Sequence, residues 1–288
     1  MTAPIHLALV VDAPQVSQRA VAEVAAALQR QLIRDVAPIW EVYATVDAFV
    51  ALEHVPPGYW PILVGDHFPG VESVGMHLDR NGQPFALVEA SPSWSLTASH
   101  EAIEMVIDPW GNRTVPGGSP MSEEGVLVEG RDQGLVEILV EICDPSGDAQ
   151  WAYTVNGYLV SDFCTPGYYD PVAAPGVRYS FTGALTRPRE ILDGGYLSWR
   201  DPATGEWWQG ERTTRPELTF RHLGRLDEDG RPIRERIDRY SPMTQLYTGI
   251  SRRDKPLADA YTRRDSTRVA AQARAAAVRG RMADLGLD

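Results

Sequence analysis

The order of apolar and polar residues predicts a strand, a long helix and two more strands in the N-terminal part of the chain. Residues 5–11 form a short β-branched apolar run that is typical of a buried strand. From residue 16 to about residue 34, apolar side chains recur at helical spacing and predict a long amphipathic helix. Residues 40–46 are rich in aromatic and β-branched residues, residues 61–64 form a short apolar run, and both predict strands.

A hairpin and a second helix follow. Asn81 and Gly82 stand between two apolar stretches, and this pair is a strong signal for a tight β-turn. The strand that leaves the turn, residues 85–89, leads towards an apolar segment over residues 99–108 that has helical periodicity. Strands that alternate with helices in this way predict an α+β fold, with helices packed on a mixed sheet.

The second half of the chain has a different pattern. Residues 115–124 are rich in Pro, Gly and Ser and predict a loop, whereas residues 134–145 are apolar and fit either a helix or a strand. Asn156 and Gly157 predict a second hairpin. From about residue 181, turn signals separate short aromatic runs and predict a small antiparallel β unit.

We therefore expect three regions along the chain. Residues 1–180 would form the main domain, with a long backing helix and a second helix that carries the candidate chemistry. Residues 181–250 would form the antiparallel β unit. Residues 251–288 are rich in Arg and Ala and predict an exposed, partly helical basic extension.

The helix predicted over residues 99–108 carries the most chemistry. His100, Glu104 and Asp108 follow one another at intervals of four residues and would share one face of the helix. Thr97 or Ser99 is expected to cap its N-terminus, and Pro109 to end it at Asp108. His100 and Asp108 would be about 12 Å apart along a straight helix, because each residue adds 1.5 Å.

A His and a Glu one helical turn apart can bind the same cation. His100 and Glu104 are the first two candidate ligands, and Glu101 is the candidate general base in an HExxE pattern. Glu141 is the first choice for a third ligand, because a carboxylate in an apolar run is costly to bury without a partner, and Asp108 is the second. The ion would be Zn²⁺, although oxygen ligands also suit Mn²⁺ or Fe²⁺.

Plainer interpretations compete with this one. The HExxE helix could lie on the surface with its polar side chains in water, and Glu141 could pair with an Arg. The aromatic face of Trp199, Trp207 and Trp208 could bind a glycan, although hairpin aromatics more often stabilise a sheet. The other histidines show no metal spacing and are expected to be structural or exposed: His6, His54, His67, His77 and His222.

Composition excludes several classes of function. The formal net charge of −12 makes nucleic acid an unexpected partner for the main body, since phosphates attract clustered Lys and Arg. The sequence has no long apolar run that would cross a membrane and no basic, apolar leader at its start. Cys143 and Cys164 are too few for a disulfide framework, so we expect two reduced thiols and a cytoplasmic protein.

The order of these elements, ending in an Asn-Gly hairpin and a helix with His100-Glu101, resembles the N-terminal half of the zincin metallopeptidases, particularly the metzincin-like ones. The likeness covers about residues 4–112. It implies that His100 is the first zinc ligand, Glu101 the general base and Glu104 the second ligand, where a His is usual. The phrases SHEAIEMVIDPWGNR, VEICDP and GYLVSDF also resemble an uncharacterised group of bacterial and bacteriophage proteins.

The leading functional hypothesis is a metal-dependent hydrolase, a zincin-like peptidase that acts on a peptide or protein. Its substrate would add to the edge of the strand over residues 85–89. The alternative is a phage or prophage virion or assembly protein with a structural or vestigial metal site. In that case the protein would lie in the host cytoplasm or the virion, and the basic tail would bind an assembly partner.

Overall fold

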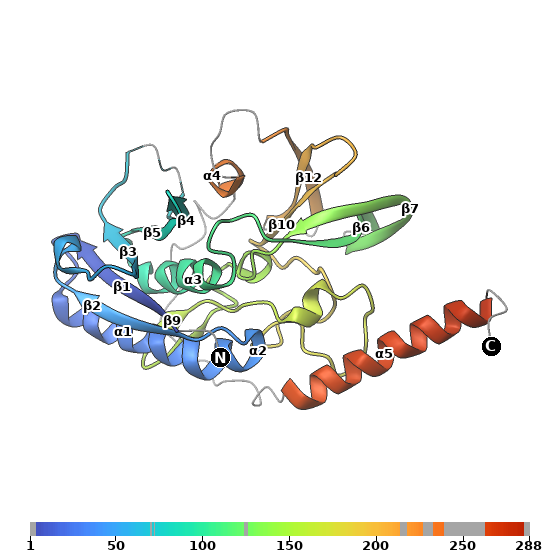
Figure 1. Cartoon of the computed structure of the whole chain (residues 1–288), viewed down its shortest axis with the longest axis horizontal. Helices are drawn as coiled ribbons and strands as arrows, with labels where there is room; N and C mark the ends of the chain where they lie inside the picture. Colours follow the sequence, from blue (N-terminus) through green and yellow to red (C-terminus); the bar gives the residue numbers. More distant parts are fainter. Residues whose placement is uncertain are drawn as a thin grey trace.

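A computed structural model describes residues 4–69, 71, 73–123, 126–213, 218–226, 233–238 and 263–284. The predicted α+β class is confirmed, because helices pack beside two large sheets and a short hairpin (Figure 1). One apolar core extends through most of the body, and smaller clusters lie beside it. In the part of the chain that is described, no helix combines the length and apolar character that crossing a lipid bilayer needs.

The first sheet is mixed and contains five strands in the order β2-β1-β3-β5-β4. Four strands are parallel, and β4 pairs antiparallel with β5. The strands have these bounds: β1 (Ile5–Asp12), β2 (Ala44–Phe49), β3 (Tyr59–Gly65), β4 (Gly75–Arg80) and β5 (Gln83–Glu89). The Asn81-Gly82 hairpin is confirmed, and both residues have the positive φ that its tight turn requires.

Two of the predictions for this sheet are wrong in detail. Trp40 belongs to a helix, so the second strand begins only at Ala44. β5 is hydrogen-bonded to β3 on one side and to β4 on the other, so it has no free edge to which a peptide substrate could add. Among the described strands of this sheet, β4 stands at that edge instead.

Two helical segments pack against each other and against this sheet. The first consists of α1 (Gln18–Gln31), a π-helical segment η1 (Leu32–Val36) and α2 (Ala37–Trp40). The long helix predicted from residue 16 to about residue 34 is confirmed, and Ser17 caps its N-terminus. The second is α3 (Trp94–Ile107), which follows β5 and ends before Pro109 as predicted. The predicted caps are wrong, because α3 begins after Ser93 and places Thr97 and Ser99 in its buried interior.

The second sheet is antiparallel, with the order β12-β11-β10-β7-β6. Its strands are β6 (Thr114–Glu123), β7 (Val126–Leu139), β10 (Tyr196–Arg200), β11 (Trp207–Arg212) and β12 (Leu218–Gly224). The loop predicted over residues 115–124 is therefore wrong. An edge strand tolerates its prolines, and a bulge between Gly118 and Ser119 takes up the irregularity. The open choice at residues 134–145 resolves as the end of β7 followed by irregular chain.

This sheet takes strands from both sides of residue 180, where we expected a boundary between the main domain and the β unit. The predicted second hairpin is confirmed by β8 (Tyr153–Val155) and β9 (Tyr158–Val160), which turn at Asn156-Gly157. Three short 3₁₀ helices complete the body: η2 (Leu52–His54), η3 (Asp144–Ser146) and η4 (Pro166–Tyr169).

Two helices follow the second sheet. The short helix α4 (Ile233–Asp238) lies beside β4, above α3 in the view of Figure 1. The expected helical tail is present as α5 (Arg263–Asp284), whose described side chains are largely exposed. Arg274 of α5 pairs with Asp170 at 3.2 Å. Residues 251–262 of the predicted tail lie outside the described residues.

Candidate metal centre

The HExxE helix is buried on nearly every side. All residues of α3 except Ser95 are buried, and the side chains of His100, Glu101 and Glu104 are inaccessible to solvent. The surface-helix interpretation is therefore wrong. A helix that is apolar around most of its circumference is an interior helix, so each of its polar side chains needs a partner inside the protein.

His100 and Glu104 face each other as predicted, and a third acidic side chain joins them. His100 Nε2 lies 3.2 Å from Glu104 Oε2 and 3.2 Å from Asp144 Oδ1. Asp144 comes from η3, which follows β7 in the chain, and its carboxylate reaches His100 of α3. Ligand atoms of these three buried residues all lie within 4.8 Å of one another, a separation that one cation can bridge.

A second group shares Glu104 with the first. It combines Glu104 with His77 from β4 and with Glu141, again with ligand atoms within 4.8 Å. His77 Nδ1 lies 3.5 Å from Glu101 Oε2 and 3.9 Å from Glu104 Oε2. His77, which we expected to be structural or exposed, is buried and belongs to a candidate ligand group. Because His77 and His100 are far apart in the sequence and come from different elements, their spacing gave no signal.

The two candidate third ligands have different positions. Glu141 belongs to the second group, with His77 and Glu104. Asp108 belongs to neither group found in the described part of the chain. Its carboxylate Oδ2 accepts a hydrogen bond from the Arg113 backbone N–H at 2.7 Å, which turns it towards the loop after α3.

Hydrogen bonds around the cluster fix the orientation of two candidate ligands. The Asp108 carbonyl oxygen lies 3.0 Å from His77 Nε2, so the Nε2–H donates to it and Nδ1 faces the carboxylates. The Cys143 backbone N–H donates to Glu104 Oε1 at 3.0 Å and leaves Oε2 towards the two histidines. Metal-binding His and carboxylate side chains are usually oriented by partners of this kind.

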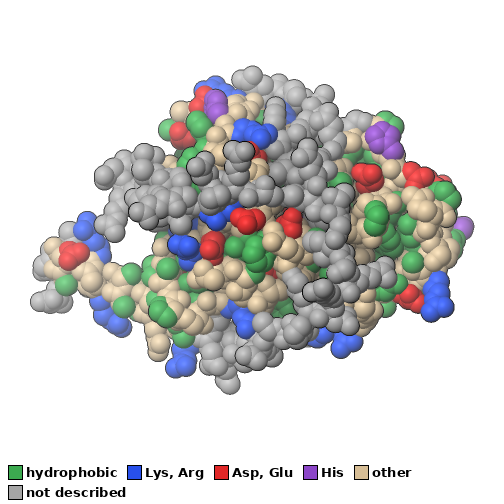
Figure 2. Space-filling view, turned by 180° about the vertical axis from the view of Figure 1, so that it is seen from behind, with side chains coloured by type: hydrophobic (Ala, Val, Ile, Leu, Met, Phe, Trp, Pro, Cys, Tyr) green, Lys and Arg blue, Asp and Glu red, His purple; other side chains and the backbone are tan. Residues whose placement is uncertain are grey.

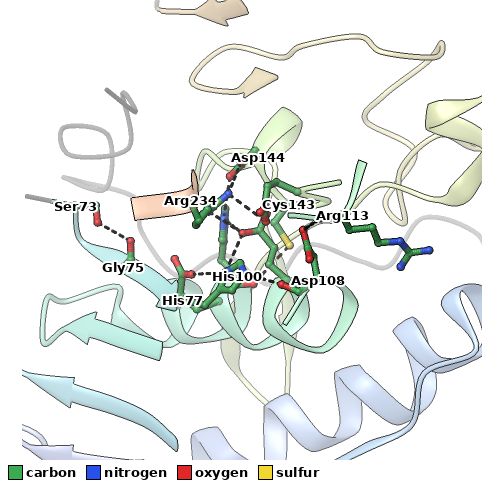
Figure 3. Close-up of polar contacts among 12 residues, drawn as sticks. Ser73, Gly75, His77, His100, Asp108, Arg113, Cys143, Asp144 and Arg234 are labelled. Atoms are coloured by element: carbon green, nitrogen blue, oxygen red, sulfur yellow. Dashed lines mark hydrogen bonds and ion pairs between the residues drawn. The ribbon is translucent and has the colours of Figure 1, made fainter. Parts of the chain in front are cut away.

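Arg234, from α4, inserts its guanidinium among the carboxylates (Figure 3). One end nitrogen, Nη2, donates to Glu104 Oε2 at 2.9 Å. The other, Nη1, lies 3.0 Å from Asp144 Oδ2 and 3.1 Å from Glu141 Oε2. The side chain of Arg234 is buried, so three acidic side chains and one fixed positive charge share a space without solvent.

This environment shifts the pKa of both histidines upwards. Burial alone would lower the pKa of His100, but Glu104, Asp144 and Glu101 outweigh it and raise the pKa well above its ordinary value. The pKa of His77 is also raised, since Glu101 and Glu104 outweigh burial and the Arg234 charge. In both rings the neighbouring carboxylates thus act against the effect of burial.

The acidic side chains divide into two kinds. Burial would raise the pKa of Glu104, but Arg234 and the two histidines outweigh it and lower the pKa. For Glu141 burial dominates and holds the pKa well above its ordinary value, despite Arg234. Asp144 is raised in pKa for the same reason, although less strongly. One carboxylate is thus held ionised while two others resist ionisation in this surrounding.

Several polar atoms of the cluster make no hydrogen bond to the residues that the structure describes. They are the two ring nitrogens of His100, Nδ1 of His77, both carboxylate oxygens of Glu101 and of Glu141, and Oδ1 of Asp144. Buried polar atoms are normally hydrogen-bonded, because leaving one unpaired costs about 1–3 kcal/mol. Charge pairing partly compensates them, because His100 Nε2 and Glu141 Oε2 lie within 3.2 Å of oppositely charged groups.

Of the residues that the sequence singled out, His100, Glu104 and Glu141 belong to the candidate groups. The sequence did not single out His77, Asp144 or Arg234. The sequence does hold a signal for Asp144, because its carboxylate ends an apolar run. A carboxylate there needs either solvent or a buried partner. For His77 and Arg234 the sequence holds no such signal, because their role arises only from how β4 and α4 pack around α3. The two cysteines are buried and unbridged, as expected.

The aromatic residues of the second sheet are mostly packed inside it. Trp207 and Trp199 are buried, and Trp199 contacts the ring of Phe220 edge to face. Trp199, Trp208 and Phe220 line a cavity of about 300 Å³ with Asp201. Trp207 is buried and does not line this cavity, so the three tryptophans do not share one face, and glycan binding by Trp199 and Trp208 stays a prediction.

No protein-family model, curated protein or solved structure matches this chain. The cluster therefore has to be interpreted from its own chemistry.

Proposed function

We propose that the chain binds a divalent transition-metal ion between His100, Glu104 and Asp144. The observation that carries the proposal is the buried convergence of these three ligand atoms within 4.8 Å. Sites with one imidazole and several carboxylates suit Zn²⁺, Mn²⁺ and Fe²⁺, so the residues fit the expected metals. The second group, with His77 and Glu141, places further ligands on the other side of Glu104.

The charge inside the cluster supports a cation. Four buried carboxylates, from Glu101, Glu104, Glu141 and Asp144, surround a single arginine that always carries its charge. The remaining negative charge has to be neutralised by protons on the histidines and acids or by a bound cation, because isolated buried charges are very costly. A divalent ion would balance the carboxylates and use the lone pairs that make no hydrogen bond.

We further propose that the metal serves a hydrolytic reaction of the zincin-like kind, with a peptide or protein as substrate. When bound, the metal would polarise a carbonyl group and lower the pKa of water. Glu101 follows His100 directly, and both of its carboxylate oxygens lack a hydrogen bond to a described residue. It is therefore the side chain that can accept a proton. His77 Nδ1, 3.5 Å from Glu101 Oε2, orients that carboxylate.

The experiment that tests this proposal separates binding from turnover. Protein prepared with Zn²⁺ would be incubated with a library of quenched fluorescent peptides, beside Glu101→Gln and His100→Ala. The proposal expects cleavage only by the unaltered chain, with metal retained in Glu101→Gln and lost in His100→Ala. Cleavage that survives in Glu101→Gln would contradict the assigned role of Glu101.

One observation favours a second candidate, a structural metal site in an assembly protein. His77, His100, Glu101 and Glu104 are all closed to solvent, whereas a catalytic metal needs an open position for water and substrate. In that case the exposed helix α5 would bind a partner in the assembly. Removal of residues 263–288 would then abolish assembly and leave metal binding unchanged.

A further inference from the structure

The guanidinium of Arg234 lies where a cation would have to bind. Its Nη2 donates to Glu104 Oε2, the same oxygen that His100 Nε2 approaches to 3.2 Å. Its Nη1 holds Asp144 through Oδ2, at 3.0 Å. A metal ion bound by His100, Glu104 and Asp144 would sit next to this fixed positive charge. Like charges repel strongly in a buried site, because the effective dielectric constant is low there.

The backbone around the cluster is shaped for this side chain. Gly111, in the turn after α3, has a positive φ of 56°, and a Cβ at this position would lie 2.7 Å from Arg234 Cβ. Arg234 therefore passes over a bare stretch of backbone to reach the carboxylates. Figure 3 shows its side chain pointing towards Asp144, and its Nη2 reaches Glu104 Oε2 at 2.9 Å.

The helix that carries Arg234 has an apolar anchor of its own. Ile237 is fully buried in a small cluster with Leu139, Tyr196, Trp207 and Leu226, which is separate from the main core. α4 is only six residues long, and an isolated helix of that length is not stable in water. Its position therefore depends on contacts such as those of Ile237 and Arg234, and a change at either residue should weaken the other.

We propose that Arg234 is an internal competitor for the metal ion, and that α4 is an autoinhibitory latch over the site. This inference rests on the proposed metal site and adds its regulation. With α4 docked, Arg234 occupies Glu104 and Asp144 and closes the cluster to solvent. When α4 is released, the two carboxylates become available to the metal, and the cluster opens on the side that α4 covered.

The test is the Zn²⁺ affinity of Arg234→Gln, measured by competition with a chromophoric chelator at a fixed pH. The glutamine removes the charge and keeps a polar side chain of similar length. The latch predicts that Arg234→Gln binds Zn²⁺ about ten to a hundred times more tightly than the unaltered chain, within the range of typical coupling between sites. Arg200→Gln is the matched control, because Arg200 pairs with Glu137 on the second sheet, and its affinity should not change.

A second variant, Ile237→Ala, tests the latch without changing any residue of the cluster. It should also raise the Zn²⁺ affinity, because it loosens α4 and leaves every ligand in place. It remains informative if Arg234→Gln does not fold, as judged by circular dichroism. Each variant is also combined with His100→Ala, which should abolish the gain.

The outcomes separate the two proposals. Tighter binding in Arg234→Gln or Ile237→Ala that depends on His100 supports the latch. Equal affinity in all folded variants, still lost in His100→Ala, overturns the latch and leaves the metal site in place. Absence of Zn²⁺ binding in every variant overturns the proposed function itself.

Discussion

Two buried polar groups meet α3 at neighbouring residues, a network around Ser99 and a charged cluster around His100. They differ in how many of their polar atoms are hydrogen-bonded. Ser99 donates to Gln31 Oε1 at 2.7 Å and accepts from the Ser161 backbone N–H at 2.9 Å. Gln31 in turn donates to Tyr153 Oη at 3.0 Å, and Tyr153 donates to Asp35 Oδ2 at 2.8 Å. At His100, one residue further on, Nε2 lies 3.2 Å from both Glu104 Oε2 and Asp144 Oδ1, and Nδ1 makes no hydrogen bond to a described residue.

The difference separates a network held by hydrogen bonds from a cluster held mainly by charge. In the network of Ser99, Gln31, Tyr153 and Asp35, donors meet acceptors, so it joins α3 to α1 without needing a ligand. The cluster around His100 and Glu104 concentrates charge and leaves lone pairs unused. Burial alone is the same in both groups, so it is hydrogen bonding that distinguishes them.

The largest expected effect is on peptide hydrolysis and comes from replacing Glu101, in the cluster around His100. Glu101→Gln should lower peptide hydrolysis by about two to four orders of magnitude, because a general base is lost while the shape is kept. The metal content should stay the same. Single-turnover cleavage of a peptide found in the library screen measures the change, with metal analysis of the same sample as the control.

A comparison of substitutions at Asp144 and Asp108 tests which of the two is a metal ligand. Asp144→Asn should weaken Zn²⁺ binding about a hundredfold or more, because it removes a charged ligand oxygen. Asp108→Asn should change the affinity much less, since the Asp108 side chain accepts from Arg113 and belongs to neither ligand group of the described chain. Chelator competition compares the two variants, and a larger loss in Asp108→Asn would reverse the assignment.

A substitution in the hydrogen-bonded network of Ser99 should lower the stability of the protein without lowering its metal affinity. Ser99→Ala leaves the Ser161 backbone N–H and Gln31 Oε1 without their partner. The free energy of unfolding should fall by about 1–3 kcal/mol. Urea unfolding monitored by tryptophan fluorescence gives this value. Reduced metal affinity in folded Ser99→Ala would show that the two groups are not independent.

The smallest expected effect is a dependence of the protein's stability on pH near neutrality, which arises in the cluster around His100. The pKa of His100 in the folded protein lies above its unfolded value of 6.5. The stabilisation by its protonated form is therefore complete below about pH 6.5 and is lost as the pH rises through the folded pKa. The raised pKa of Glu141 acts in the same direction.

Thermal unfolding should show this effect in metal-free protein, as a melting temperature that falls by a few degrees above about pH 6.5. Protein with bound Zn²⁺ should not show this fall, since metal binding releases the protons and becomes stronger as the pH rises. A metal-free melting temperature that rises over the same pH range would contradict the raised pKa of His100.

Local chemistry made much of the fold predictable. The Asn-Gly turns, the helical periodicity of α1 and the Pro109 stop are properties of neighbouring residues, and the structure confirms each of them. β6 was missed because its Pro and Gly residues look like a loop and are tolerated only by its position at the edge of a sheet. The sheet partners of β7 and β10 are far apart in sequence and left no local trace.

The same limit applies to the candidate site. His100 and Glu104 share one helix, so their meeting follows from helical geometry and was predicted. Asp144 and Arg234 reach them only through the packing of η3 and α4. Figure 2 shows the molecule from behind, with acidic and basic side chains of the described residues both present on this face.

The most direct test of the central claim is the metal content of protein purified without added metal, determined by elemental mass spectrometry beside His100→Ala. Both samples would be measured again after a Zn²⁺ titration and removal of excess metal. The account predicts close to one equivalent of a transition metal in the titrated chain and none in His100→Ala. Absence of metal in both samples, even after the titration, would contradict it.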